Sequence, residues 1–260
     1  MKISVIILTR NESSHIASCI QSVLFADEIL VIDSESTDDT QSIAKNEGAT
    51  VLVNKWPGFA HQRQFGIEHA HGDWILFLDA DERVTSELQK RILMICNDEN
   101  HSIDGYEIPR RNYVCGKEMH HMWPARSLRL FKRMKGRMTL DREVHEKVII
   151  DGLTSRLKEP MLHYTYDTME QYLTKMNAYT SLLARQSYEK DKNSTYTYLF
   201  IKAFIRYHHY FIDQYISRGA FRDGIYGFYL SLLHAISGMT VLFKIADLKR
   251  KYHAKSEKIT

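Results

Sequence analysis

The sequence has few cysteines and lacks a large excess of charge of either sign. The three cysteines among 260 residues, Cys19, Cys96 and Cys115, are odd in number and widely spaced. They exclude a disulfide framework and favour a reducing compartment. The 35 basic and 32 acidic side chains leave a formal charge of +3, which is too close to balance for a nucleic-acid-binding protein. We therefore expect an ordinary globular chain: one large domain, or one domain with a helical extension.

Two further features are absent near the N-terminus. The apolar run at residues 3–8 is short and ends in polar residues, so it does not predict a secretory signal, and we expect a cytoplasmic protein. The turn at residues 9–14 contains no glycine. A nicotinamide-dependent oxidoreductase needs a glycine-rich turn after its first strand, and that class of enzyme is therefore excluded.

The first hundred residues alternate short apolar strands with amphipathic helices. Strands are predicted at 3–8, 28–32, 50–53 and 74–78, with a helix at 59–70 before the last of them. This alternation predicts an α/β fold with a mostly parallel central sheet and helices on both faces. A ligand site is then expected beyond the carboxyl ends of the strands.

The pattern changes twice in the rest of the chain. Residues 103–164 contain extended segments and turns, and the pair Asp151-Gly152 predicts a β-hairpin. After Asp167 the pattern is helical, and residues 196–215 are rich in aromatic side chains. We therefore predict a boundary near residue 165, followed by a helical region over 166–260.

An uncharged stretch and a basic tail lie near the C-terminus. Residues 224–243 contain no Asp, Glu, Lys or Arg, but they include glycines and polar side chains. A helix in the membrane interface, a buried core or dimer helix, and a spanning helix are all compatible with this stretch, and the interfacial helix is favoured. Residues 244–258 hold six basic and two acidic side chains. Such a tail suits an anionic membrane surface or a solvated helix end.

The clearest chemical signal is the run Phe-Leu-Asp-Ala-Asp-Glu at residues 77–82. Because side chains alternate along an extended segment, Asp79 and Asp81 can point the same way at the end of an apolar strand. Two carboxylates in that position suit Mg²⁺ or Mn²⁺ that holds a diphosphate. The alternative is an exposed acidic turn that caps the next helix.

Polar side chains also follow the first two predicted strands. Glu12 follows the first strand and Asp33 ends the second, so both should lie on the same rim as Asp79. A carboxylate can accept the imide N–H of uracil or a ribose hydroxyl, which makes these two residues candidate nucleotide anchors. The alternative is that Thr9, Asn11 and Ser36 only cap helices.

At this point the chain resembles glycosyltransferase family 2. The resemblance rests on the segments SVIILTRNE, ILVIDSESTDDT and LFLDADE within residues 1–82, on WPGFAHQRQ at 56–64 and on VHE at 144–146. It extends over nearly the whole chain and is strongest to lipopolysaccharide-core glucosyltransferases that add β-glucose to an inner-core heptose. It implies a GT-A catalytic domain over 1–165, with a nucleotide-binding part (1–100) and an acceptor part (101–165).

The resemblance also implies roles for individual residues. It assigns the nucleotide sugar to six residues and the metal, Mg²⁺ or Mn²⁺, to three. The nucleotide-sugar set is Thr9, Asn11, Glu12, Asp33, Arg63 and Asp79, and the metal set is Asp81, Asp79 and His163. Glu146 is the expected catalytic base that takes the proton of the acceptor hydroxyl, with Asp141 and Glu143 as alternatives. Gln64 and Ala125 depart from the family pattern, where asparagine and an acidic residue are usual.

The implied reaction transfers a sugar, with UDP-glucose the favoured donor, to a lipid-linked envelope glycan with inversion. Transfer to polyprenyl phosphate or to a capsule precursor is a rival within the same fold. A nucleotide-sugar-binding protein without turnover is the alternative from another class. The expected partners are the nucleoside-diphosphate sugar, a glycolipid acceptor and a peripheral membrane contact through 196–258 at the inner face of the cytoplasmic membrane, with no nucleic acid.

Two further groups of side chains have more than one interpretation. The pair His120 and His121 could bind a metal, but a polar loop is favoured because no further ligand lies at a suitable spacing. The basic run over 126–137 could contact phosphorylated sugars or lipid head groups. Its ordinary interpretation is a solvated edge strand.

Overall fold

The computed structural model describes residues 1–98, 102–123, 126–139 and 147–256. The chain forms two compact units, which we call the sheet unit (residues 1–111 and 124–165) and the helical unit (residues 112–123 and 166–260). The short segment 112–123 thus belongs with the helices, although the sequence pattern places it in the domain of the strands. The division into a nucleotide-binding and an acceptor part stays a prediction.

Four parallel strands form the first half of the central sheet. They are β1 (Ile3–Thr9), β2 (Glu28–Asp33), β3 (Thr50–Val53) and β4 (Trp74–Asp79), and they lie in the order β3-β2-β1-β4. All seven residues of β1 are buried, which explains why its sequence is mainly apolar on both faces rather than alternating. The four strands predicted from the sequence are confirmed, with ends that agree within one residue.

The other half of the sheet is mixed. β8 (Arg126–Lys132) pairs antiparallel with β4, and β6 (Gly105–Val114), β12 (Met161–Tyr166) and β5 (Glu82–Val84) follow it in the sheet. β7 (Lys117–Met119) and β11 (Thr154–Arg156) pair with β6, whereas β9 (Gly136–Met138) and β10 (Val148–Ile150) form a separate two-stranded sheet. The predicted α/β fold with a mostly parallel central sheet is confirmed.

The hairpin predicted at Asp151-Gly152 is wrong. The strands on either side of this turn do not pair with each other, because β10 pairs with β9 and β11 runs parallel to β6. Gly152 has φ +153, and the turn sends the chain from one sheet to the other. A turn signal marks a change of direction, but the partners of the flanking strands depend on distant segments.

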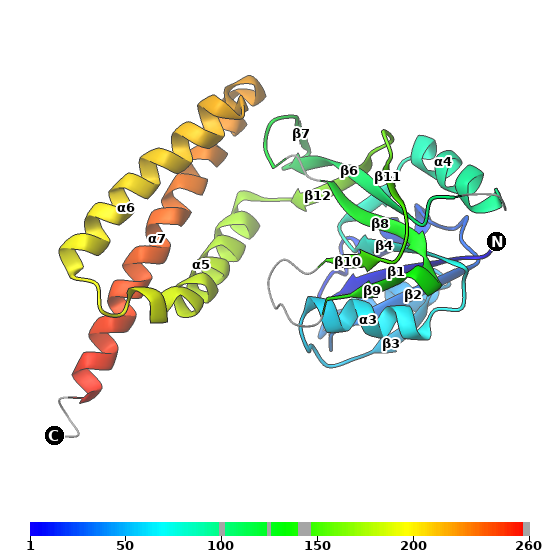
Figure 1. Cartoon of the computed structure of the whole chain (residues 1–260), viewed down its shortest axis with the longest axis horizontal. Coiled ribbons are helices and arrows are strands. Elements are labelled where there is room, and N and C mark those ends of the chain that lie inside the picture. The colour runs from blue at the N-terminus through cyan, green and yellow to red at the C-terminus, as the bar shows by residue number, and fades with distance from the viewer. Residues whose placement is uncertain (99–101, 124–125, 140–146, 257–260) are drawn as a thin grey trace. The chain divides into compact units, whose positions relative to one another are not determined.

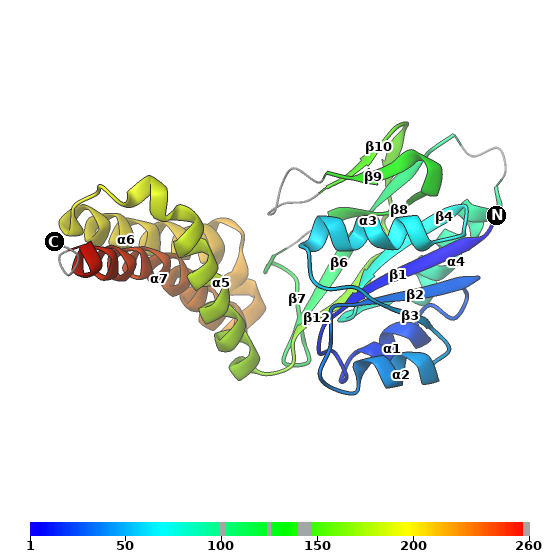
Figure 2. The ribbon, with the colours of Figure 1, turned by 90° about the horizontal axis from the view of Figure 1, so that it is seen from below.

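Helices cover both faces of the parallel strands, as Figure 2 shows. On one face lie α1 (Ile16–Gln21), α2 (Thr40–Asn46) and α4 (Ser86–Asn97), which pack against alternate strand residues such as Val5 and Ile7. On the other face α3 (Phe59–His69) packs against Ile6 and Leu8. Gly66 permits this approach, since a Cβ there would lie 2.6 Å from Ile6 Cγ2. Successive side chains of β1 therefore point alternately into two separate cores.

The helical unit consists of long helices joined by short turns. They are α5 (Met169–Asp191), α6 (Tyr196–Phe211) and α7 (Gly224–Ser256), with a π-helical turn η2 (Ile212–Ser217) and a 3₁₀ turn η3 (Ala220–Asp223) between the last two. Thr168 and Thr195 cap α5 and α6 through their side-chain oxygens. Figure 1 shows α6 and α7 side by side, and Leu199 and Ala203 of α6 are buried in one core with Leu242 of α7.

One described helical stretch, Ala220–Tyr252, is long and apolar enough to cross a membrane. Of its most apolar 18 residues, 44% are buried inside the protein. Length and composition therefore do not distinguish the spanning, interfacial and buried alternatives for residues 224–243.

Candidate functional site

Three of the predicted site residues end neighbouring parallel strands. Thr9 of β1 is paired in register with Asp33 of β2, and Leu8, one residue earlier, is paired with Asp79 of β4. The three strands run in the same direction, and the paired residues are at their ends, so these side chains lie at one edge of the sheet. This is the carboxyl edge at which an open α/β sheet binds its ligands.

The loops after β1 and β2 are bound to each other by hydrogen bonds. Asn11 N donates to Ser36 Oγ at 2.8 Å, Asn11 Oδ1 accepts from Thr37 N at 2.8 Å, and Glu12 N donates to Thr40 Oγ1 at 2.8 Å. Asn11 adopts φ +55, a conformation that asparagine tolerates better than most residues. The alternative of simple helix caps is wrong for Asn11 and Ser36, because the N-cap positions of α1 and α2 are other residues, without side-chain cap bonds.

Asp33 organises the loop that follows its strand. Its carboxylate is fully buried and accepts hydrogen bonds from Ser36 N at 2.9 Å, from Ser36 Oγ and from Gln41 Nε2 at 2.6 Å. A carboxylate has about four lone-pair sites, so three of them are already used. The geometry therefore gives Asp33 a role in holding the loop after β2, and direct contact with a nucleotide stays a prediction.

Thr9 presents a different case at the same edge. Its side chain is buried, and its Oγ1 has no hydrogen-bond partner in the described part of the chain. A buried hydroxyl without a partner costs about 1–3 kcal/mol. A ligand that offers a donor or acceptor at this point would remove that cost, which agrees with the predicted contact of Thr9 with the nucleotide sugar.

Asp79 lies between two arginines. Its Oδ1 is 2.8 Å from Arg63 Nη2 of α3, and its Oδ2 is 2.8 Å from Arg129 Nη2 of β8. The same Arg129 nitrogen lies 2.9 Å from Glu82 Oε1, and Glu82 Oε2 accepts from Asp79 N at 2.9 Å. Arg110 Nη1 adds a longer contact of 3.5 Å to Glu82. Arg63, expected to bind the donor, thus pairs with the first carboxylate of the motif inside a larger network, and its contact with the donor stays a prediction.

The charges of this network decide which carboxylate stays ionised. Burial acts to raise the pKa of Asp79, but the guanidinium groups of Arg129 and Arg63 outweigh burial and hold that pKa well below its usual range. For Glu82, which is fully buried, burial and the negative charge of Asp79 raise the pKa. Asp79 is therefore the permanent anion, and both its oxygens are already engaged by arginine.

The second aspartate of the motif lies beside His163. Asp81 Oδ2 and His163 Nε2 are 3.5 Å apart, with side chains 18% and 15% exposed. The two residues are 82 positions apart in the chain, and they meet because β12 pairs antiparallel with β5 and places His163 opposite Glu82. His163 Nδ1 lies 3.2 Å from Thr165 Oγ1, which directs Nε2 toward Asp81.

This pair fits part of a divalent metal site. One carboxylate oxygen and one imidazole nitrogen are ligands that Mn²⁺ accepts, and Mg²⁺ is usually held by one or two carboxylates together with substrate phosphates. Among the described residues no group of three or more His, Cys, Asp or Glu side chains is arranged around one point. Asp81 and His163 could supply two ligands, and a diphosphate would have to complete such a site; metal binding here stays a prediction.

The sequence analysis missed the role of Arg129. The basic run over 126–137 was expected to be a solvated edge strand or a surface for head groups, but β8 lies between β4 and β6, and Arg129 is almost fully buried. Its Nη1 has no partner in the described part of the chain. The available signal was an arginine flanked by Leu128 and Leu130 in the middle of an apolar strand.

Several predicted residues contribute less to the described site. Glu146, the expected catalytic base, lies outside the described residues, as do Asp141, Glu143 and Ala125. Gln64, where the family usually has asparagine, accepts from Met138 N at 3.1 Å and donates to Glu68 at 3.0 Å. Its side chain therefore joins α3 to β9.

In the helical unit the histidine pair forms part of a polar loop. Asp223 is buried and accepts from the backbone N–H groups of His120 and His121 at 3.1 and 3.0 Å, and it lies 3.2 Å from His121 Nδ1. These bonds fasten the loop to η3. The hydrogen bonds from this loop to Asp223 support the favoured interpretation of a polar loop.

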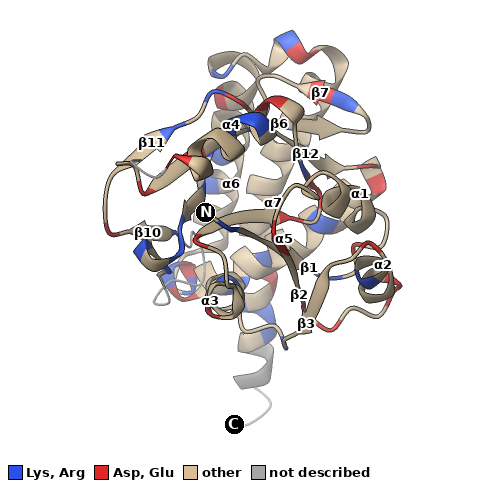
Figure 3. Cartoon of the chain, turned by 90° about the vertical axis from the view of Figure 1, so that its right-hand side faces the viewer, with Lys and Arg blue, Asp and Glu red and all other residues tan. Residues whose placement is uncertain are grey.

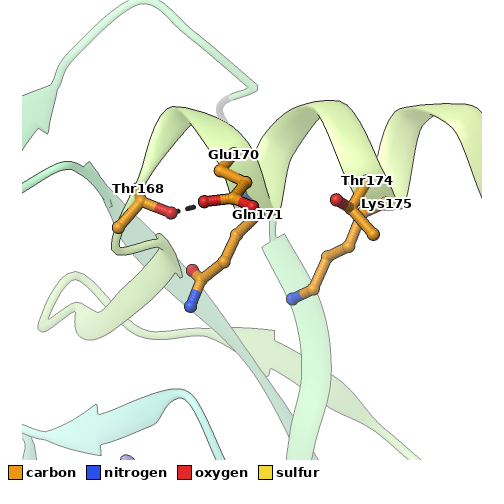
Figure 4. Close-up of a pocket in the computed structure, with 5 residues that line it drawn as sticks. All are labelled: Thr168, Glu170, Gln171, Thr174 and Lys175. Carbon is orange, nitrogen blue, oxygen red and sulfur yellow. Dashed lines mark hydrogen bonds between the residues drawn. The ribbon is translucent and has the colours of Figure 1, made fainter.

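The first turns of α5 also line a pocket, shown in Figure 4. Its walls come from Thr168, Glu170, Gln171, Thr174 and Lys175. Thr168 Oγ1 accepts from Gln171 N at 3.2 Å as the helix cap. All five residues lie at the start of one helix. The hydroxyl of Thr168 at the edge of the pocket is accounted for by its role as the helix cap.

All three cysteines are free, as expected from their number and spacing. Cys19 and Cys96 are buried, and burial raises the pKa of both thiols, to about 12 for Cys96. Neither thiol is a nucleophile near neutral pH, since the thiolate is the reactive form.

Comparison with known proteins gives the same family along most of the chain. The model described as Glycosyl transferase family 2 matches residues 4–160. The lipopolysaccharide core biosynthesis glycosyltransferase LpsC of Rhizobium meliloti (strain 1021) is 30% identical over 98% of this chain and 94% of its own length. The uncharacterized glycosyltransferase RP128 of Rickettsia prowazekii (strain Madrid E) is 32% identical over 96% of this chain and 88% of its own.

Among solved structures, glucosyl-3-phosphoglycerate synthase from Mycobacterium tuberculosis, in complex with Mn²⁺, UDP-glucose and phosphoglyceric acid, is 28% identical over 42% of this chain and 44% of its own. Its TM-score is 0.37, which is too low to carry weight for the fold or the ligands. The family match covers more than half of the chain, and the relatives align over nearly all of it. The chain therefore belongs to glycosyl transferase family 2 and is a glycosyltransferase of the GT-A fold.

Proposed function

We propose that the chain is a metal-dependent, inverting hexosyltransferase that moves glucose from UDP-glucose onto a lipopolysaccharide core acceptor. The observation that carries this proposal is the arrangement at the carboxyl edge of the sheet. There Asp79 is clamped between Arg63 and Arg129, and Asp81 lies beside His163. The near full-length similarity to a lipopolysaccharide core glycosyltransferase supports the choice of acceptor.

The donor would lie across the ends of β1, β2 and β4. Thr9 Oγ1 is the buried hydroxyl that could bond to the donor. The hydrogen bonds of Asn11 N and Glu12 N hold the neighbouring loop in one conformation. Arg63 lies against Asp79 and close to Asp81 and His163, the proposed metal ligands. A cation at this position would meet a diphosphate. Preorganised charges of this kind stabilise a departing anion without the cost of reorganisation.

Asp81 and His163 would hold the divalent ion, which would neutralise the charge that develops on the diphosphate leaving group. Asp79 cannot approach such an ion freely, because two guanidinium groups occupy its oxygens. We propose that Asp79 orients Arg63 and Arg129, while Asp81 provides the direct carboxylate ligand. Glu146 would accept the proton of the acceptor hydroxyl as that oxygen attacks the anomeric carbon.

A thermal-shift measurement with purified protein tests the donor half of this proposal. UDP-glucose is compared with UDP-galactose, UDP-N-acetylglucosamine, GDP-mannose and ADP-heptose, each with and without Mn²⁺. A ligand present at 100 times its Kd stabilises the folded state by about 2.7 kcal/mol, so no acceptor is needed to see binding. We expect the largest rise in Tm for UDP-glucose with Mn²⁺. Equal shifts with and without metal would contradict the metal site.

Transfer to acceptor tests the other half. Labelled UDP-glucose is incubated with a heptose-terminated core glycolipid, with polyprenyl phosphate and with capsule precursors. We expect label in the core glycolipid alone, in a β linkage. Label in polyprenyl phosphate would favour the rival acceptor, and donor binding without transfer to any acceptor would contradict the proposed turnover.

A further inference from the structure

Helix α6 carries an apolar stripe on its exposed face. Phe200, Ile201, Phe204 and Ile205 repeat at a spacing of four residues, so they form two adjacent rows along the helix. Each of these side chains is 51–61% exposed. An exposed aromatic or branched side chain is common singly, but a continuous row of them marks an interaction surface.

The stripe continues past the end of α6. Ile212 and Ile216 follow at the same spacing on η2 and are 50% and 59% exposed. Ile225, in the first turn of α7, is 72% exposed. Ring contacts connect α6 and α7 at both ends, between Phe200 and Phe243 at 6.4 Å and between Phe211 and Phe228 at 6.1 Å. The exposed apolar surface therefore belongs to the helix pair and not to one helix alone.

Packing inside the helical unit rests mainly on another face of α6, although Phe200 of the stripe also contacts Phe243 of α7. The buried face of α6 is made by Leu199 and Ala203, which lie in one core with Val241, Leu242 and Ile245 of α7. The residues of the stripe follow Leu199 and Ala203 by one or two positions in the sequence, so they lie on another face of the helix. Substitution of the stripe should therefore change an external contact and leave the bundle intact.

Charge around the stripe has one predominant sign. Residues 196–252 contain eight Lys and Arg against three Asp and no Glu, a surplus of five, whereas the whole chain has a surplus of only three. The α6 helix contains Lys202 and Arg206 and no acidic residue, although Lys202 Nζ lies 2.6 Å from Asp191 Oδ1 of α5. Figure 3 shows Lys and Arg also on the last turns of α7, near the C-terminus. The rest of the chain is slightly acidic, so the positive charge is concentrated on this unit.

The basic residues at the end of α7 are mostly engaged within the unit. Lys244 Nζ donates to four oxygens of α5 at 2.6–2.9 Å, and Lys249 Nζ donates to Ser194 O. Arg250 and Lys251 flank Asp247 at 2.6 and 2.7 Å. The predicted membrane role of the tail therefore has less support than the stripe on α6.

We propose that the exposed stripe of α6, η2 and the first turn of α7 lies in the interface of a bilayer that contains anionic lipids. Apolar side chains would enter the boundary between head groups and acyl chains, and the surplus of Lys and Arg would attract anionic head groups. At a rise of about 1.5 Å per residue, α6 is about 24 Å long, which suits a helix that lies in the membrane plane. A second copy of the chain fits less well, since two such faces would bring like charges together.

Flotation of the full-length protein with vesicles tests the proposal without donor, metal or acceptor, so its outcome is independent of the proposed function. Vesicles of phosphatidylcholine alone are compared with vesicles that contain 30% phosphatidylglycerol. The stripe variant is F200S/F204S/I205S. The matched control is L24S/M94S/L153S, which removes three side chains of the sheet unit with 61–65% exposure. Circular dichroism and the sedimentation velocity of each protein are recorded in parallel.

We expect the wild type and the control to float with anionic vesicles, less so at 0.5 M salt, and the stripe variant to lose at least about tenfold in partitioning. The proposal is overturned if the wild type does not float, or if the control loses as much as the stripe variant. It is also overturned if the wild type is a stable dimer that the stripe variant converts to monomers without any change in flotation. In that case the stripe is an interface between two copies of the chain.

Discussion

The two units of the chain differ in which apolar and charged side chains they bury and which they expose. The sheet unit buries its large apolar residues in two cores on either side of one sheet and gathers buried charges at the sheet edge. The helical unit has smaller cores, yet 17 of the 26 exposed large hydrophobic side chains of the described chain belong to it. Since the helical unit is the smaller of the two, this difference is not one of size.

The difference assigns a separate task to each unit. Buried, mutually paired charges such as those of Asp79, Arg129 and Glu82 hold a fixed geometry, as a site for chemistry requires. Exposed apolar rows contribute little to folding and mark a surface that can contact another molecule. Substitutions of the buried charges of the sheet unit should therefore affect transfer or stability, whereas those on the stripe should leave the stability of the fold unchanged.

The largest effect is expected from Asp81→Ala. Loss of the carboxylate next to His163 removes half of the protein ligands of the proposed metal site. We expect the transfer rate to fall by at least about a hundredfold while Tm changes little. The measurement is initial-rate transfer from UDP-glucose with and without EDTA. Asp151→Ala, which removes an exposed carboxylate of the same unit, is the control. Metal-dependent turnover close to wild type would remove Asp81 from the site.

A comparable loss, in kcat and not in donor affinity, is expected from Glu146→Gln. The amide keeps the shape of the side chain but cannot accept the acceptor proton, so kcat should fall by about 10²–10⁴-fold. Donor affinity, measured by titration with UDP-glucose and Mn²⁺, should stay within about twofold. If Glu146→Gln leaves kcat unchanged, the base is another residue, and Asp141 and Glu143 are the next to test.

A stability effect of about 3–5 kcal/mol is expected from Arg129→Met. The variant leaves the buried Glu82 and the partly buried Asp79 without their shared guanidinium. Arg156→Met is the matched control, because Arg156 forms an ion pair of the same length, 2.9 Å, with Glu107 but is 76% exposed. We expect less than about 1 kcal/mol there. Urea unfolding gives both values, and equal losses would mean that burial of the pair does not matter.

Sequence patterns predicted the parallel half of the sheet well because its signals are local. Residues 3–9 form β1 as a mainly apolar run, and the carboxylates that end β2 and β4 could be located from the strand ends alone. The antiparallel half depends on pairings between distant segments. The approach of His163 to Asp81 needs the register of β12 on β5, and burial of Arg129 needs β8 to lie inside the sheet. The resemblance supplied His163 as a candidate ligand, whereas the leucines on either side of Arg129 could indicate only that it is buried, not which carboxylates it pairs with.

The smallest effect is expected from Phe204→Ser on the stripe. Phe204 is 58% exposed, so the folded state gains little from it, and we expect the free energy of unfolding to change by less than about 0.5 kcal/mol. Leu199→Ala on the buried face of the same helix should instead cost about 2–5 kcal/mol. Denaturant unfolding of both variants measures the contrast within one helix. A loss for Phe204→Ser as large as that for Leu199→Ala would mean that the stripe packs against part of this chain in solution, and the membrane proposal would lose its basis.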